Sequence, residues 1–271
     1  MREITASFKF LLFILLCIAV VPLQIIIFSI HKGPYAYIIP QIFHKGVCCI
    51  FRIKVIIERD RPPENVQCIY VSNHLSYLDI PVIGRALKAS FVAKEDVSSW
   101  PIFGFLSNLQ QTIFISRERN KASDGRTNLD ISIENGTSLI LFPEGTSTDG
   151  QEVLPFKSSL FSIVFSEKRK SIPIYPFTVK ILHVNKHSVS TQNDRDLYSW
   201  HFKMDTTLGA HLWNFAKSSG ATIVLQFHAP LTSQNYTDRK ELAKACQDAV
   251  SKGLENKTLD AMTNNTDKTG V

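Results

Sequence analysis

Apolar residues are concentrated at the start of the chain. Residues 10–30 contain no charged side chain, and Phe8 extends the run past Lys9. About 20 consecutive apolar residues can cross the hydrocarbon core of a bilayer, and this run is longer than the roughly 7–15 apolar residues of a signal peptide. We therefore predict a membrane-anchoring helix, interrupted by Pro22 and Gln24.

A second apolar stretch follows at residues 35–53, but it carries His44, Lys45 and Arg52. These side chains favour an interfacial or re-entrant helix whose basic groups lie at the level of the lipid headgroups. The basic residues on the two sides of the first stretch nearly balance, so charge does not decide whether that stretch spans the membrane or only embeds in it. We interpret residues 1–54 as a helical membrane anchor.

The rest of the chain alternates short apolar runs with segments of helical spacing. Buried strands, rich in Val, Ile and Phe, are predicted at residues 55–58, 67–72, 90–93, 112–116, 138–142, 172–179 and 222–227. Helices are predicted at residues 79–88, 124–135, 157–168, 208–217 and 238–254. The alternation predicts one α/β domain, with a largely parallel mixed sheet flanked by helices. We assign residues 55–257 to this domain and the polar residues 258–271 to a flexible tail.

Composition narrows the possible functions. The 30 Lys and Arg residues outnumber the 24 Asp and Glu residues, which gives a net charge of +6. This mild excess favours anionic partners such as lipid headgroups and is too small to indicate nucleic acid. The 44% of hydrophobic residues exclude a mostly disordered chain. Five cysteines without a Cys-x-x-Cys pair argue against a disulfide framework or a zinc ribbon.

The first candidate site follows the predicted strand 67–72. His74 and Asp79 lie on either side of a turn into a predicted helix, where the carboxylate can accept the N–H of the imidazole and fix its tautomer. The other ring nitrogen could then take a proton from a substrate hydroxyl as a general base. Ser72 and Ser76 raise a Ser-His-Asp alternative, although the chain has no Gly-x-Ser-x-Gly motif. A surface histidine beside a helix-capping aspartate would explain the pair without catalysis.

Further polar residues follow other predicted strands. Glu144, Gly145 and Thr146 form a loop in which the glycine permits close approach of a ligand to the backbone. Arg117 also follows a strand, and its planar guanidinium suits phosphate because it can bind two oxygens at once. Lys157 is another cationic candidate. Each of these features alone is also compatible with a capped turn or a solvated strand end.

Together, these motifs resemble the glycerolipid acyltransferase family. The block from Asn73 to Asp79 reads Asn-His-x-x-x-x-Asp, a second block ends at Arg117, residues 142–146 read Phe-Pro-Glu-Gly-Thr, and residues 172–176 are a looser fourth match. The blocks occur in the family's order, after a membrane segment. The resemblance implies a single acyltransferase domain that transfers an acyl group from acyl-CoA or acyl-acyl carrier protein to a lysolipid hydroxyl. It implies no metal ion and no resident cofactor.

The resemblance also implies roles for individual residues. His74 deprotonates the acceptor hydroxyl, Asp79 orients His74, and the hydroxyl oxygen attacks the thioester without an acyl-enzyme. The implied substrate-binding residues are Arg117, Glu144, Gly145, Thr146 and Lys157. The implied partners are the lysolipid, the acyl thioester and the membrane. The implied location is the bacterial inner membrane, with the catalytic domain facing the cytoplasm.

Two branches of the family fit the sequence. The family usually carries Arg after Glu-Gly-Thr, whereas this chain has Ser147, and the loss of a cation weakens the case for a phosphate-bearing acceptor. Residues 142–160 are also similar to the lyso-ornithine lipid acyltransferase branch, whose acceptor lacks phosphate. We favour the 1-acylglycerol-3-phosphate branch, which acylates the sn-2 hydroxyl to give phosphatidate, because Arg117 is retained.

A different class of protein remains open. A non-catalytic, membrane-anchored protein that binds anionic lipid headgroups would explain the basic charge and the apolar N-terminus. It would leave the pairing of His74 with Asp79 unexplained.

Overall fold

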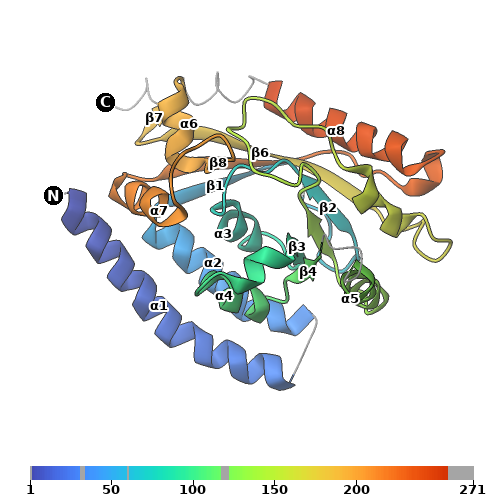
Figure 1. Ribbon diagram of the computed structural model, residues 1–271, viewed down its shortest axis with the longest axis horizontal. Coiled ribbons are helices and arrows are strands. Elements are labelled where there is room, and N and C mark those ends of the chain that lie inside the picture. The colour runs from blue at the N-terminus through green and yellow to red at the C-terminus, as the bar shows by residue number, and fades with distance from the viewer. Residues whose placement is uncertain (1, 31–33, 60, 117–121, 256–271) are drawn as a thin grey trace.

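A mixed β-sheet forms the centre of the protein (Figure 1). The structure is a computed structural model that describes residues 2–30, 34–59, 61–116 and 122–255. The strands are β1 (Ile53–Glu58), β2 (Ile69–Ser72), β3 (Ser90–Lys94), β4 (Ile113–Ile115), β5 (Leu139–Leu141), β6 (Ile174–Val184), β7 (His187–Ser188) and β8 (Ala221–Phe227). Their order across the sheet is β1-β8-β6-β2-β5-β3-β4, and β7 pairs with β6.

Most neighbouring strands run in the same direction. The pairs β6–β2, β2–β5, β5–β3, β3–β4 and β1–β8 are parallel, while β6 is antiparallel to β8 and β7. The predicted largely parallel mixed sheet is therefore confirmed. Because β2 and β5 are parallel neighbours, the loops that follow them leave the same edge of the sheet, where ligands bind in open α/β sheets.

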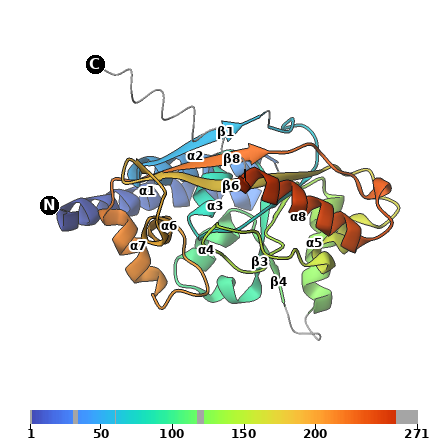
Figure 2. The same cartoon turned by 90° about the horizontal axis from the view of Figure 1, so that it is seen from above.

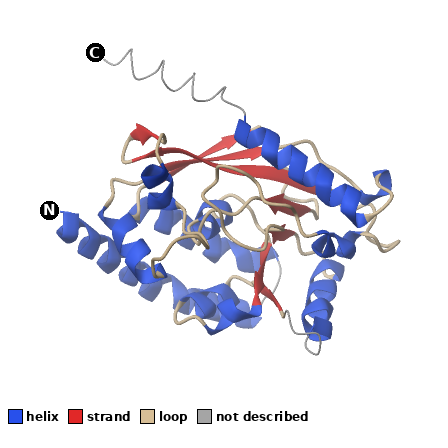
Figure 3. Cartoon of the chain, turned by 45° about the horizontal axis from the view of Figure 1, so that its top comes forward, coloured by secondary structure: helices blue, strands red, loops and turns tan. Residues whose placement is uncertain are grey.

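Helices cover both faces of the sheet (Figure 3). The α-helices are α1 (Arg2–Ile30), α2 (Ile38–Ile50), α3 (Asp79–Gly84), α4 (Phe103–Leu109), α5 (Ala122–Glu134), α6 (Gln192–Tyr198), α7 (Leu208–Lys217) and α8 (Arg239–Glu255). Alternate residues of β2 point to opposite faces. Tyr70 joins the core with residues of α2, α3 and α7, whereas Ile69 and Val71 join the core with residues of α5 and α8.

The main error of the sequence interpretation concerns residues 157–168, which were predicted as a helix. The structure instead has a short 3₁₀ helix at Ser158–Val164. Phe161 and Val164 are both buried there, and a 3₁₀ helix aligns residues three positions apart on one side. The helices α4 and α6 and the short strand β7 were not predicted.

Helix α1 packs along the domain (Figures 1 and 2). The Lys9 ammonium donates to the Ser218 carbonyl at 2.9 Å, and the Gln24 amide donates to the Leu109 carbonyl at 2.7 Å. The opposite side of α1 exposes Ile4, Phe8, Leu11, Ile14, Leu15, Ile18, Leu23, Ile25 and Ile26. Within the described residues, α1 is the one helix long and apolar enough to cross a membrane, and it fits a membrane anchor.

The predicted division into an anchor (1–54), a catalytic domain (55–257) and a tail (258–271) stays a prediction. Strand β1 begins at Ile53, just before the predicted boundary. The tail lies outside the described residues.

Candidate active site

Two loops meet at the carboxyl edge of the sheet. Residues 73–78 follow β2, and residues 142–150 follow β5; Val71 of β2 is in register with Leu141 of β5. Their backbones are linked directly, because the Thr148 N–H donates to the His74 carbonyl at 2.8 Å. The parallel pairing thus brings together the two sequence blocks that contain most of the predicted site residues.

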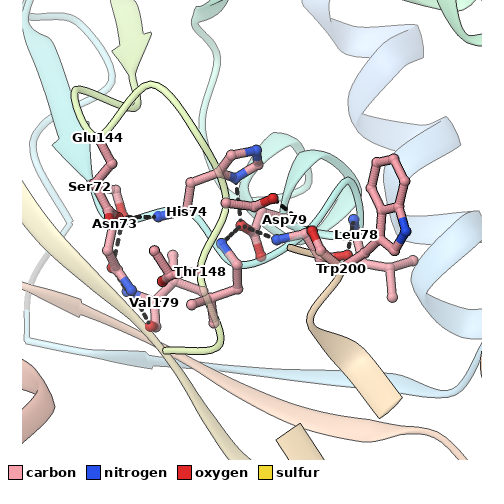
Figure 4. Close-up of polar contacts among 12 residues, drawn as sticks. Ser72, Asn73, His74, Leu78, Asp79, Glu144, Thr148, Val179 and Trp200 are labelled. Carbon is pink, nitrogen blue, oxygen red and sulfur yellow. Dashed lines mark hydrogen bonds and ion pairs between the residues drawn. The ribbon is translucent and has the colours of Figure 1, made fainter. Parts of the chain in front are cut away.

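The structure places His74 against Asp79 (Figure 4). The distance between His74 Nδ1 and Asp79 Oδ2 is 2.8 Å, and the imidazole stacks on the Phe142 ring with 4.2 Å between centroids. The His74 side chain is 22% exposed, and its Nε2 makes no hydrogen bond to another described residue. The carboxylate therefore orients the ring, and Nε2 is the nitrogen available to a substrate.

Asp79 is fully buried and surrounded by hydrogen-bond donors. Besides the His74 ring, its Oδ2 accepts from the backbone N–H groups of Leu75 at 2.7 Å and Ser76 at 3.1 Å, and its Oδ1 accepts from the Tyr198 hydroxyl at 3.0 Å. A buried carboxylate is costly unless such donors compensate for the lost hydration. These contacts hold the carboxylate in one position beside His74.

Asn73 fixes the same loop to the sheet. Its side-chain amide donates to the Val179 carbonyl at 2.9 Å and accepts from the Val179 N–H at 2.8 Å, as Figure 4 shows. The residue is fully buried, so it cannot reach a substrate. Its contacts prevent the backbone at His74 from shifting relative to β6.

Glu144 is also turned into the protein and is 3% exposed. Its Oε1 accepts from the His74 N–H at 2.8 Å, and its Oε2 accepts from the Leu154 N–H at 2.9 Å. The sequence interpretation made Glu144 a substrate-binding residue, but the structure uses both of its oxygens to hold the backbone. Burial raises the pKa of Glu144 to about 7, against the opposing effect of the two N–H donors.

This raised pKa predicts a pH dependence of stability. The ordinary pKa of a glutamate is 4.5, so between pH 4.5 and about 7 the folded protein retains the Glu144 proton more readily than the unfolded chain. The contribution of Glu144 to the free energy of unfolding is fully present below pH 4.5 and is lost as pH rises through about 7. The loss is on the order of 3 kcal/mol. In urea unfolding of the detergent-solubilised protein at several pH values, Glu144→Gln should remove this part of the pH slope. Identical slopes in the two proteins would contradict the prediction.

The remaining predicted binding residues lie along the loop after β5. Gly145 has φ of +68°, and a Cβ there would lie 2.2 Å from Lys157 Nζ, so the ammonium sits directly over the glycine. The Lys157 N–H donates to the Pro143 carbonyl at 2.9 Å. Thr146 is partly exposed on the same loop. Arg117 lies outside the described residues.

An open apolar cavity lies beside the loop that follows β2, between α1, α2 and α4. Its volume is about 170 Å³. Tyr77, Leu78 and Ile80, which belong to the same segment as His74 and Asp79, form part of its wall. Phe13, Val20, Phe43, Val47, Phe103 and Leu106 line it further. Because its wall is mostly apolar, the cavity suits a hydrocarbon chain.

Sequence reasoning missed Tyr77 and Tyr198. The Tyr77 hydroxyl lies 2.8 Å from Nδ1 of His211 on α7, and Tyr198 at the end of α6 donates to Asp79. The Thr191–Asp194 capping box marks the start of α6 and could have located that helix, but no local signal links Tyr198 to Asp79. Among the described residues, no three His, Cys, Asp or Glu side chains are grouped to hold a metal ion.

Comparison with known proteins identifies the family. Residues 52–180 match the family model described as acyltransferase. The chain is 35% identical over 198 residues to the lyso-ornithine lipid O-acyltransferase of Rhodobacter capsulatus, covering 72% of this chain and 68% of that one. It is 29% identical over 251 residues to the enzyme of the same name from Brucella abortus, covering 90% and 91%.

A solved structure shares the fold of this chain. The crystal structure of the 1-acyl-sn-glycerophosphate acyltransferase PlsC from Thermotoga maritima matches with a TM-score of 0.67 at 20% identity, covering 94% of this chain and 97% of that one. The sequence matches and the shared fold agree with the sequence blocks around His74 and Glu144. This chain belongs to the glycerolipid acyltransferase family.

Proposed function

We propose that this acyltransferase esterifies the free hydroxyl of a lyso-ornithine lipid, with His74 as general base. The observation that carries the mechanism is the contact between His74 Nδ1 and Asp79 at 2.8 Å, which leaves Nε2 available. In this reaction Nε2 takes the hydroxyl proton, the hydroxyl oxygen bonds to the thioester carbonyl carbon, and the carbon–sulfur bond breaks. The proton then passes to the departing thiolate, so an ester and a free thiol are formed.

The loop after Glu144 favours an acceptor without phosphate. Ser147 occupies the position where the family usually has Arg, and its hydroxyl donates to the Trp200 carbonyl at 2.6 Å. The cation that the family places there is therefore replaced by a neutral group already engaged with the backbone. The names of the Rhodobacter and Brucella relatives support the same acceptor. This proposal replaces the preference for lysophosphatidate drawn from the sequence.

Lysophosphatidate is the second candidate, because Lys157 Nζ lies over Gly145. An exposed ammonium beside a loop that permits close backbone approach suits a phosphate group. Arg117 would add a second cation, and the name of the Thermotoga protein supports this acceptor.

One assay separates the two acceptors. Purified full-length protein in mixed micelles is offered lyso-ornithine lipid and lysophosphatidate side by side, with a labelled acyl thioester, and each product is quantified. We expect the first acceptor to turn over faster, and we expect Lys157→Ala to leave the KM for it within about twofold. Preferred turnover of lysophosphatidate, together with a KM for it that rises in Lys157→Ala, would overturn the proposed acceptor.

The donor and the membrane arrangement complete the proposal. The acyl donor is acyl-CoA or acyl-acyl carrier protein, and the location is the bacterial inner membrane with the catalytic domain on the cytoplasmic side. Helix α1 contacts the domain from Glu3, which accepts from the Trp213 indole, to Gln24. At 1.5 Å per residue this span is about 32 Å, so α1 would lie along one leaflet rather than leave the domain to cross the bilayer.

A further inference from the structure

Three buried polar side chains interrupt the wall of the apolar cavity. They are Gln24 of α1, His44 of α2 and Gln110, which follows α4; each is at most 9% exposed, and all three line the cavity. We call these three residues the polar patch. The patch is built from three elements that are far apart in the sequence, so it is a product of the fold rather than of one local motif.

Two atoms of the polar patch have no hydrogen-bond partner among the residues that the structure describes. These are Gln24 Oε1 and His44 Nδ1, both buried. The amide of Gln24 is held from its other side, because its Nε2 donates to the carbonyls of Ala36 at 3.0 Å and Leu109 at 2.7 Å. Its oxygen is therefore fixed in orientation and remains an unsatisfied acceptor. Buried polar atoms without partners destabilise a protein, and each one calls for an explanation.

His44 is held as firmly as Gln24. A Cβ added to Gly84 of α3 would lie 2.4 Å from the Cδ2 atom of His44, so the imidazole rests directly on this glycine. Burial lowers the pKa of His44 to about 4 and outweighs the opposite effect of the nearby Gln110 side chain. The ring is therefore neutral at physiological pH and suits a neutral group.

We propose that the polar patch binds a hydroxyl group carried on a lipid chain in the cavity. This inference rests on the proposed acyl transfer, because it assumes that the cavity receives a chain of one of the substrates. A hydroxyl can donate to Gln24 Oε1, which a keto group cannot do. It can also donate to or accept from His44, whichever ring nitrogen carries the proton. A charged group does not suit so apolar a cavity.

The hydroxylated chain could belong to the acyl thioester or to the lysolipid, and the assay has one arm for each. In one arm the thioester carries a hexadecanoyl chain with a hydroxyl at successive positions, and the lysolipid carries its acceptor hydroxyl alone. In the other arm the lysolipid carries a further hydroxyl at successive positions besides its acceptor hydroxyl, and the thioester chain is plain. The reference is the saturated chain without the added hydroxyl, which in the lysolipid keeps the acceptor hydroxyl.

We expect one arm to show a preferred hydroxyl position, with kcat/KM about tenfold above that for the plain chain. His44→Phe keeps the ring on Gly84 but removes both nitrogens, so it should abolish this preference while still transferring plain chains. Ser107→Ala removes another polar group of the cavity wall that is less buried, and it should retain the preference. Equal kcat/KM for plain and hydroxylated chains in both arms, or a preference that persists in His44→Phe, would overturn the inference.

A binding measurement keeps this test independent of catalysis. The Tm of the full-length protein in detergent is measured with free hexadecanoate and with its hydroxylated series. A ligand that binds the folded state more tightly raises the Tm further. We expect the largest rise with the preferred hydroxyl position in wild type, and no such difference in His44→Phe. If an ordered water alone occupies the patch, the plain chain will stabilise the protein as much as any hydroxylated one, which contradicts the inference.

The two measurements show whether the hydroxyl-binding inference or the proposed acyl transfer is wrong. Acyl transfer without any hydroxyl preference would contradict the hydroxyl-binding inference only. A Tm preference in a protein that transfers no acyl group from any thioester would contradict the proposed function only.

Discussion

Replacing His74 by Ala is expected to lower the kcat of acyl transfer by about 10²- to 10⁴-fold, the range that a general base contributes. The variant keeps Asp79 and its contacts with the N–H groups of Leu75 and Ser76 and with Tyr198. What it loses is the Nε2 atom that removes the proton from the acceptor hydroxyl. Because this atom acts on the reacting group, the loss should fall on kcat more than on KM.

The measurement is transfer of a labelled acyl group by matched amounts of folded protein, with the Tm recorded for each. His187→Ala is a suitable control, because His187 is an exposed histidine on β7, away from the two loops that meet at His74. It should transfer acyl groups at the wild-type rate. Undiminished transfer by His74→Ala would show that the base is a different group.

The sheet could be predicted from the sequence because its central strands are short and almost entirely apolar. The residues of β2 and β5 are all buried and, apart from Ser72 at the end of β2, they are apolar, so each strand is an apolar run followed by a polar loop. Once these two runs are taken as parallel strands, their loops must share an edge. The proximity of the block at His74 to the block at Glu144 follows from this geometry.

The orientation of the site side chains could not be predicted in the same way. The sequence makes Glu144 a candidate binding residue because of its place in the Phe-Pro-Glu-Gly-Thr block. In the structure it is buried because two backbone N–H groups, at His74 and at Leu154, are turned toward it. A sequence records neither the direction of an N–H group nor the segment that will supply it.

Contacts between residues far apart in the sequence could not be predicted either. Tyr198 donates to Asp79 across 119 residues, and Lys9 of α1 reaches Ser218 across 209 residues. In the sequence, Lys9 only interrupts an apolar run. In the structure it is 3% exposed and hydrogen-bonded, which places α1 against the domain.

Replacing Asp79 by Asn is expected to lower kcat by about 10²- to 10⁴-fold as well, although the side chain keeps nearly the same shape. Three donors face Oδ2, and the Tyr198 hydroxyl faces Oδ1. The carbonyl oxygen of Asn can replace Oδ2. Its NH₂ group then faces the Tyr198 hydroxyl, which can rotate to accept a hydrogen bond. The loop can therefore keep its structure, while the negative charge that would stabilise a protonated His74 is lost.

Tyr198→Phe is the matched control for this substitution. It removes one neutral donor from Oδ1 and leaves the charge and the three donors on Oδ2, so its kcat should fall by no more than about tenfold. Acyl transfer, KM and Tm are measured for both variants. A large loss of kcat in Asp79→Asn with a nearly unchanged KM and Tm requires that the charge acts on His74 during proton transfer. If the two variants lose equal activity and equal Tm, Asp79 acts only as a structural hydrogen-bond acceptor, because the one change they share is the altered contact at Oδ1.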